Sequence, residues 1–429
     1  MNFLSRVKAL KTYPSLPEVI TALCEGYSFS SFLNDLRAGI TVGVISLPLA
    51  MVFAIHSGLT PERGLYTSIV AGFLISLLGG SRVQIGGPAG AFVILVYAVV
   101  QKHGYEWLAL ATLLAGGLLI LFGIFRLGSL IHHVPKPVVT GFTTGLALVL
   151  MTSQIKDFLG LSIDNLAPDL FEKIGQYIAH IHTLNPLCLI VSMVSLSIIL
   201  YLQKRSKKIP GAIIAIIITG GLTAFFELPI ETIDTKFGKI ASELPPPTLP
   251  FFSLEFAIRV LPDAVSIALL GALESLLSAT IADSMTGFRH KPNCELIGQG
   301  LANIGSSLFG GIPATGAIAR TTANIQIGGR TPVSGIIHAA TVFVLIALFA
   351  PLAEKMPLGA LAAILMVVAW NMSDIGHFLA VLKGTRKERV LLICSFLATA
   401  CLGLGLAVQL GLLAAIIAFL YKKMIKPIA

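Results

Sequence analysis

The strongest constraint on this chain is a series of long apolar runs with almost no charged residues. Pro210–Phe226 and Gly405–Leu420 contain almost only aliphatic residues, Gly and Thr. Each run has about the length of one helical bilayer crossing. Across all 429 residues only 12% are charged, about half of the ~25% share that a soluble domain uses to cover its surface. The chain is therefore predicted to be a polytopic, all-α integral membrane protein.

We count about fourteen apolar segments that fit membrane spans. Those of the first half are roughly 37–55, 65–79, 88–101, 107–125, 137–155, 184–202 and 209–226. Those of the second half are roughly 262–282, 293–309, 314–327, 332–350, 356–371, 390–404 and 406–421. The predicted divisions are an N-terminal segment (1–36), a seven-span repeat (37–226), an external connecting loop (227–261), a second seven-span repeat (262–421) and a basic tail (422–429).

Basic residues gather at the ends of these spans. The main clusters are Lys204–Lys208, Lys383–Arg389 and Lys422–Lys426. With a cytoplasmic N-terminus all three lie on one side of the membrane, as the positive-inside rule requires. We expect a multi-pass protein of the inner (plasma) membrane with both termini in the cytoplasm. The net charge of +9 then reflects orientation, and no nucleic-acid partner is implied.

Several classes of function find no support in the sequence. The five cysteines have no paired spacing, so neither a disulfide framework nor a metal site is expected. No nucleophile–His–acid set and no phosphate loop within a βαβ unit is present, so we expect no enzyme and no cofactor. The first 35 residues are polar and broken by Pro, which does not fit a cleavable export signal.

One pattern recurs at the same place in both halves. Gly86–Ala91 (GGPAGA) and Gly310–Ala317 (GGIPATGA) each lie about fifty residues after the start of their half and precede a short apolar helix. Because seven spans is an odd number, the second copy must enter from the opposite side, which makes the repeat inverted. Gly and Pro at these places predict that spans three and ten are half-helices with short extended leads.

Two half-helices that begin near the bilayer midplane would direct their free N–H groups at one place. Each helix start carries about half a positive charge, so that place attracts anions. Paired, interrupted spans are typical of a transporter's substrate site; the alternative is that the glycines only allow close helix packing. We expect bulky residues at Ala89 or Gly316 to block a ligand, while Gly72 and Gly117 serve as controls.

Two ionisable residues are predicted within the bilayer, where charge is costly and usually functional. Glu274 lies near the centre of span eight, with Ser278 one turn later on the same face, and Arg320 lies about two turns into span ten. Glu274 and Ser278 are candidates for proton coupling, and Arg320 for anion attraction. The alternative is an ion pair between Glu274 and Arg320 that only joins two helices. His338 in span eleven is expected to be a satisfied core histidine.

These residues resemble the SulP family of anion transporters. In the first half the similarity runs through Asp35–Gly39, Leu47–Pro48, Gly58–Pro61, Gly64–Tyr66, Gly79–Arg82 and Gly87–Pro88. In the second half it runs through Glu274–Leu277, Ala282–Asp283, Gly298–Asn303 and Pro313–Thr321.

The resemblance implies fourteen spans in two inverted repeats of seven. Spans 1–4 and 8–11 would form a core domain that moves like an elevator against a gate domain of spans 5–7 and 12–14, in a homodimer. The anion would bind between the starts of spans three and ten, with Glu274 at the coupling position. The substrate-binding residues implied are Leu49, Phe53, Ala89, Gly90, Thr315, Gly316, Ala317 and Arg320.

The chain departs from the family pattern in two ways. Family members usually carry a cytoplasmic STAS domain after the last span, whereas this sequence stops at Ala429. Either the sequence is truncated or regulation through that domain is absent. Sodium-coupled bicarbonate members have Asp at the position of Glu274, so Glu274 and Ala89 resemble the proton-coupled bacterial branch.

The sequence therefore predicts a secondary active transporter of small anions of the sulfate, bicarbonate or dicarboxylate type, coupled to protons rather than sodium. A nucleobase or ascorbate symporter of the same architecture is the first alternative, but such proteins have an acid in span ten, where this chain offers Thr315, Arg320 and Thr321. An anion channel or exchanger is the second alternative.

Overall fold

The computed structural model describes residues 16–128, 135–163, 166–167, 170–205, 211–373 and 375–401. In the first half the elements are α2 (Glu18–Cys24), α3 (Phe29–His56), α4 (Pro61–Leu78), β1 (Gly86–Gly87), α5 (Gly90–His103), α6 (Tyr105–Ile124), α7 (Lys136–Ser153), α8 (Ile155–Leu159), α9 (Leu170–Ala179), η2 (Ile181–Thr183), α10 (Pro186–Arg205) and α11 (Gly211–Phe225). In the second half they are α12 (Ile233–Phe237), α13 (Leu254–Thr286), α14 (Pro292–Leu308), β2 (Thr315–Gly316), α15 (Ile318–Ile327), α16 (Val333–Glu354), α17 (Leu358–Met372), α18 (Ile375–Leu382) and α19 (Arg386–Cys401).

Each predicted span from 37–55 to 390–404 coincides with a helix. Within the described residues, seven helices are long and apolar enough to cross a membrane, and α5 and α11 are shorter apolar helices. The chain is thus a mostly helical membrane protein. The last predicted span (406–421) and the basic tail (422–429) lie outside the described residues, and the count of fourteen crossings in two inverted repeats stays a prediction.

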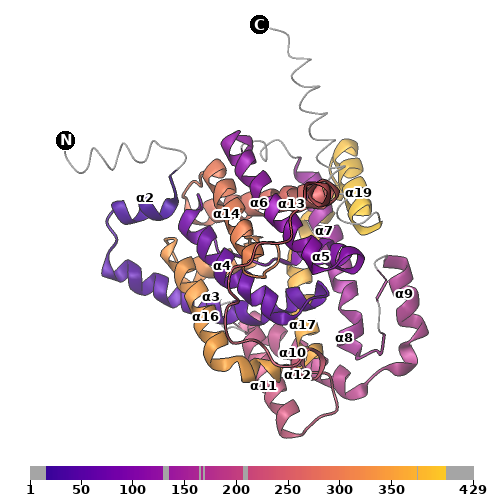
Figure 1. Ribbon diagram of the computed structural model, residues 1–429. Helices are drawn as coiled ribbons and strands as arrows, with labels where there is room; N and C mark the ends of the chain where they lie inside the picture. The colour runs from indigo at the N-terminus through magenta and orange to yellow at the C-terminus, as the bar shows by residue number, and fades with distance from the viewer. Residues whose placement is uncertain are drawn as a thin grey trace, which may run out of the picture.

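Helices from the two halves of the sequence interleave. The early helices α3 and α4 pack against α16 and α14, and α6 packs against α13 and α14 (Figure 1, where indigo and violet helices lie among orange ones). Further along, α7 packs against α17 and α19. Neither half could therefore bury its apolar surface without the other.

Close helix packing through glycine occurs away from the Gly–Gly–Pro breaks. A Cβ on Gly116 of α6 would lie 2.6 Å from the carbonyl oxygen of Gly300 on α14, and a Cβ on Gly300 would lie 2.5 Å from that of Gly116. The two backbones touch because neither residue has a side chain, which is the small-residue packing common between membrane helices.

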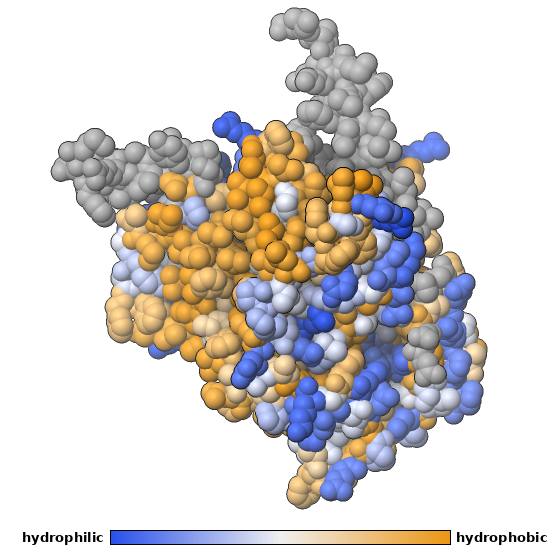
Figure 2. Space-filling view, viewed as in Figure 1, coloured by the Kyte–Doolittle hydropathy of each residue, from blue (hydrophilic) through white to orange (hydrophobic). Residues whose placement is uncertain are grey.

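The surface separates into apolar and polar areas. Figure 2 shows a broad area of hydrophobic residues in the upper left and centre of the view. Hydrophilic residues gather towards the lower right, where Figure 1 places α8 and α9. Large apolar side chains also stay exposed on α10, α11, α16 and α19, such as Ile217 and Leu348. Exposed apolar surface on this scale indicates contact with lipid.

The long loops contain short helices that the apolar pattern did not predict. Residues 156–183 include α9 and η2, and α12 lies within the connecting loop. A capping box begins α12: the Thr232 hydroxyl accepts from the N–H of Thr235, whose hydroxyl accepts from the N–H of Thr232. Such local capping forms a helix without an apolar run.

Candidate functional site

The two Gly–Gly–Pro-type segments meet as a short antiparallel strand pair. Gly86 pairs with Gly316 and Gly87 with Thr315, so β1 and β2 cross directly before α5 and α15. This confirms the short extended leads predicted from the sequence. Neither Ala89 nor Ala317, which precede the two helices, supplies a side-chain cap. The first-turn N–H groups of both helices therefore have no side-chain acceptor.

The start of α5 faces α3, α7 and α17. A Cβ on Gly90 would lie 3.3 Å from Cε1 of Phe53, 3.3 Å from Cδ2 of Leu150 and 3.6 Å from Sδ of Met372. Phe53 and the neighbouring Leu49 are buried within α3 and share an apolar cluster with Leu150. The structure thus brings Phe53 and Gly90 together, as the resemblance implied, and adds Leu150 and Met372.

The start of α15 is held by hydrogen bonds to α13 and to the residue before β1. Thr315 donates through Oγ1 to the carbonyl of Gly271 on α13 at 3.0 Å. The N–H of Ala317 donates to the carbonyl of Ile85, the residue before β1, at 2.9 Å. Thr315 and Ala317 therefore hold the two leads and α13 together.

Gly316 does not face open space, which corrects one expectation from the sequence. The position of a Cβ on Gly316 is already filled by the side chain of Gln84. A larger residue would displace Gln84 rather than a ligand. Gly72 is likewise no neutral control, because its Cβ would lie 3.2 Å from the carbonyl oxygen of Gly86. Gly117 has nothing within 4 Å of its Cβ position and keeps its value as a control.

Glu274 lies buried on α13 beside the half-helix leads. It is 6% exposed, and within the described residues its carboxylate has no hydrogen bond or ion pair. Positions one turn away on the same face bind the second lead: Gly271 accepts from Thr315, and Ser278 donates to the Thr321 hydroxyl at 3.4 Å. Glu274 is therefore held next to α15 by its neighbours while its own oxygens stay unengaged.

Arg320 lies buried against β1 without a partner. The residue is only 2% exposed, and neither Nη1 nor Nη2 of its guanidinium has a hydrogen-bond acceptor among the described residues. A Cβ on Gly87, whose φ is 149°, would collide with Nη1 of Arg320 and lie 3.4 Å from Oγ of Ser68. Glu274 and Arg320 are both described, and no ion pair joins them. The purely structural bridge between these two residues is therefore absent from this structure.

His338 of α16 was not recognised as part of this region. It is 0% exposed, and both ring nitrogens lack a hydrogen-bond partner. The expectation of a satisfied core histidine is therefore wrong. Its ring lies 3.6 Å from the Cβ position of Gly72, which also faces Gly86. A histidine in an otherwise apolar span is the one feature of the sequence that could have indicated it.

A buried acid of α14, Glu295, was also missed. It is 0% exposed and lies in the first turn of its helix. An acidic residue is common in the first turn of a helix, so the sequence pattern does not single out Glu295. Its contacts reach the loop before β1, so it belongs to the surroundings of the site.

The chain matches a known protein family over most of its length. The Sulfate permease family matches residues 32–395. The chain is 44% identical over 401 residues to the putative sulfate transporter YvdB of Bacillus subtilis, with 92% of this chain and 75% of that protein covered. It is 32% identical over 399 residues to the bicarbonate transporter BicA of Picosynechococcus, with 90% and 70% covered.

Two solved structures have a similar fold. The transmembrane domain of a cyanobacterial bicarbonate transporter BicA superposes with a TM-score of 0.79 at 30% identity, covering 91% of this chain and 98% of that one. SLC26A9 superposes with a TM-score of 0.85 at 19% identity, covering 98% and 70%; this second likeness concerns the fold alone. The length of the family match and the identity to these relatives show that the chain belongs to the sulfate permease (SulP) family.

Proposed function

We propose that the protein is a secondary active transporter of small anions, of the sulfate, bicarbonate or dicarboxylate type, which it binds between the starts of α5 and α15. One observation carries the proposal: two helix starts without side-chain caps cross at β1 and β2, beside a buried arginine with no acceptor. The names of the relatives, a putative sulfate transporter and a bicarbonate transporter, support the same substrate class.

The electrostatics of the crossing favour an anion. Arginine keeps its proton in proteins, and an unpaired buried cation is strongly unfavourable. An anion near Arg320 would neutralise that charge and accept from the first-turn N–H groups of α5 and α15. Leu49, Phe53, Ala89 and Gly90 would form its apolar and backbone wall, and Thr315, Gly316 and Ala317 the opposite lead.

Glu274 supports coupling to a proton. An ionised carboxylate beside the helix starts would repel a bound anion, and protonation would remove that repulsion. Anion and proton would then each favour binding of the other, because such coupling is reciprocal. The carboxylate has no described partner to hold it in one state, and Ser278 on the same face is the candidate to assist it. Sodium coupling is the less favoured alternative.

We further propose that the movement is elevator-like. The core would comprise α3–α6 with α13–α16, which pack together, and the gate the remaining spans. The proposed assembly is a homodimer in the inner membrane with both termini cytoplasmic. An acid on α15, which a nucleobase symporter of this architecture would need, is absent from the sequence of that helix.

Uptake into proteoliposomes tests the function. The purified protein is reconstituted and offered labelled sulfate, bicarbonate or succinate, with and without an inward proton gradient. We expect saturable uptake of at least one anion, accelerated by external acid. Acceleration by sodium alone would contradict proton coupling, and conductive flux that collapses any imposed gradient would indicate a channel. Absence of uptake for every anion, with protein-free liposomes as background, would contradict the proposal.

A further inference from the structure

Glu295 accepts hydrogen bonds from four donors in the interior of the protein. Its Oε2 accepts from the backbone N–H groups of Gly80 at 2.8 Å and Ser81 at 3.1 Å. Its Oε1 accepts from Oγ of Ser275 at 3.0 Å and Nε2 of Gln299 at 2.8 Å. A set made only of donors suits an ionised carboxylate, which accepts and does not donate. Glu295 therefore carries a negative charge that is fully engaged by its neighbours.

These contacts lead directly to the two half-helix starts. Gly80 and Ser81 belong to the loop between α4 and β1. Ser275, which follows Glu274 on α13, also accepts from Nε2 of Gln84 at 2.9 Å. The side chain of Gln84 fills the space in front of Gly316 in β2. Glu295 thus reaches the first lead directly, and the second lead through Ser275 and Gln84.

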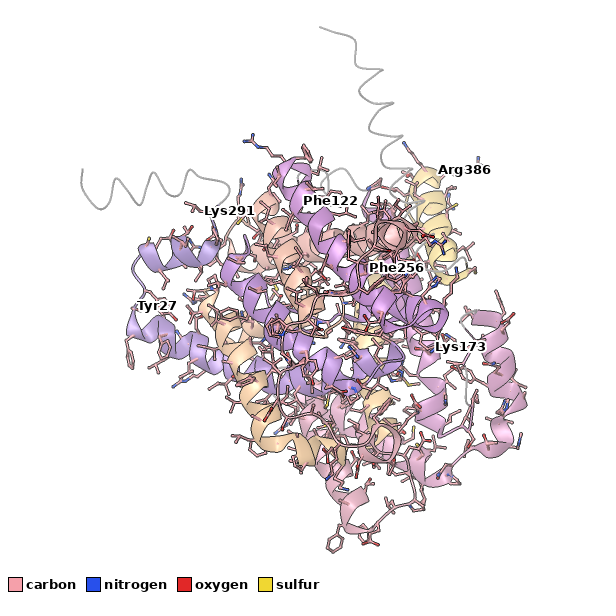
Figure 3. The ribbon with its side chains drawn as sticks, in the orientation of Figure 1. Tyr27, Phe122, Lys173, Phe256, Lys291 and Arg386 are labelled. Atoms are coloured by element: carbon pink, nitrogen blue, oxygen red, sulfur yellow. The ribbon has the colours of Figure 1, made fainter. Side chains whose placement is uncertain are left out.

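The same loop is held on its cytoplasmic side by ion pairs. Arg82 contacts Glu18 of α2 at 3.0 Å, and Lys291 contacts the same carboxylate at 2.9 Å. Figure 3 shows Lys291, which directly precedes α14, beside α2. The backbone adds two bonds, from Glu18 to the carbonyl of Gly79 and from Lys291 to that of Gly80. Glu295 is the inner anchor of a loop whose outer anchor is this pair of cations.

The loop depends on these anchors because its glycines offer no side chains to pack. A Cβ on Gly79 would lie 2.9 Å from Oε2 of Glu295, so the carboxylate can approach only because glycine stands there. If the carboxylate were lost, two buried N–H groups would have no acceptor, which is costly, and the loop would shift. A site made of helix starts tolerates errors of only about 0.5 Å.

We propose that Glu295 is a positioning residue for the anion site: its ionised carboxylate fixes the loop that places β1 and the start of α5 against β2 and Glu274. The inference rests on the proposed function for its readout in anion binding. It adds a second buried acid to the site, one that acts through the backbone and does not touch the anion.

The central experiment compares Glu295→Gln with Glu255→Gln. The amide keeps the size of the side chain but places two N–H groups among four donors, so the loop must rearrange. Glu255 lies on α13, its side chain is 78% exposed, and among the described residues its ion pair is with Arg259. Sulfate binding is measured by calorimetry on purified, monodisperse protein, and hydrogen exchange is followed at residues 80–81. We expect Glu295→Gln to raise the sulfate Kd about tenfold or more and to speed exchange at residues 80–81, while Glu255→Gln changes neither.

A purely architectural role predicts another result. Glu295→Gln would then lower the melting temperature while the folded protein kept its normal Kd, and that outcome overturns the inference. Should Glu295→Gln fail to fold, Glu295→Asp carries the test, since it keeps the charge while its shorter side chain cannot hold the N–H groups of Gly80 and Ser81 in the same way. A raised Kd at unchanged melting temperature supports the inference, and an unchanged Kd overturns it.

Failure of the proposed function would look different. If the wild-type protein bound neither sulfate nor the other anions, the transport assignment would fall. Exchange at residues 80–81 would still decide the positioning role: faster exchange in Glu295→Gln supports it, and unchanged exchange overturns it.

Discussion

Two buried glutamates, Glu274 on α13 and Glu295 on α14, differ in their hydrogen-bond partners. Glu295 is 0% exposed, and its oxygens accept from four donors. Glu274 is 6% exposed, and its oxygens have no described partner. The carboxylate of Glu295 is held in place by its donors, whereas that of Glu274 is not. Burial alone therefore does not distinguish the two residues; their hydrogen-bond partners do.

The basic residues show the same contrast. Arg82 and Lys291 lie beside α2 and pair with Glu18. Arg320 lies at the crossing of the leads, and its terminal nitrogens have no acceptor. Since unpaired buried charge is unfavourable, the structure concentrates that cost at one place, where a ligand would relieve it.

The largest expected effect belongs to Glu274→Gln. The substitution preserves size and removes the group that binds the proton, so uptake driven by an inward proton gradient should fall to the level of protein-free liposomes. The fold should persist, because no described hydrogen bond is lost. The measurement is labelled-anion uptake in proteoliposomes, with Glu255→Gln as the matched control. Undiminished gradient-driven uptake would remove the distinction drawn between Glu274 and Glu295.

The second-largest effect is expected for Arg320→Ala. Loss of the unpaired cation should raise the anion Kd by about 10- to 100-fold, equivalent to ~1.4–2.8 kcal/mol. Thermal stability should change little, since no described ion pair breaks. Calorimetry and thermal melts on the same preparation measure both quantities.

Arg259→Ala, at an exposed i,i+4 pair with Glu255, is the control for a change in net charge. A collapse in melting temperature with normal affinity in the folded protein would show that Arg320 supports the architecture instead.

An effect of similar size, on stability instead of binding, is expected for Gly316→Ala. Because Gln84 occupies the Cβ position, the new methyl group must push Gln84 aside and strain its bond to Ser275. We expect the free energy of unfolding to fall by about 1–3 kcal/mol, as is usual for overpacking. Gly117→Ala, with open space around it, should be neutral or slightly stabilising. Equal melting temperatures for the two variants would show that the leads are looser than described.

The smallest effect should follow Arg82→Ala. Arg82 would lose its contacts with Glu18 and Glu25, but Glu18 keeps its contact with Lys291. The anion Kd should stay within about twofold, because Glu295 still holds the loop. Calorimetry at low and high salt checks this. A loss of affinity as large as that of Glu295→Gln would place the main anchor at the ion pairs with Glu18.

Much of the fold was predictable because membrane spans are apolar at a fixed length. The half-helices were predictable too, since Gly86–Pro88 and Gly310–Pro313 break the helical pattern in each half. The packing inside the site was not. Gln84 fills the space before Gly316, and Arg320 contacts Gly87 and not Glu274. Both contacts depend on side-chain directions that are set by packing between helices distant in the sequence. The sequence pattern does not indicate a special role for Glu295, because an acidic residue in the first turn of a helix is common.

The pairing of β1 with β2 has a consequence for how the protein is made. Ile85 and Thr321, which bond where the two leads meet, lie 236 positions apart in the sequence. At a synthesis rate of ~5–20 residues per second, β2 is made roughly ten seconds to a minute after β1. Throughout that interval the first half is already entering the bilayer with its lead unpaired. A chain interrupted before α15 would hold most of the described helices but could not pair β1 with β2, so under the proposed function an anion could stabilise only a chain that has been synthesised past β2.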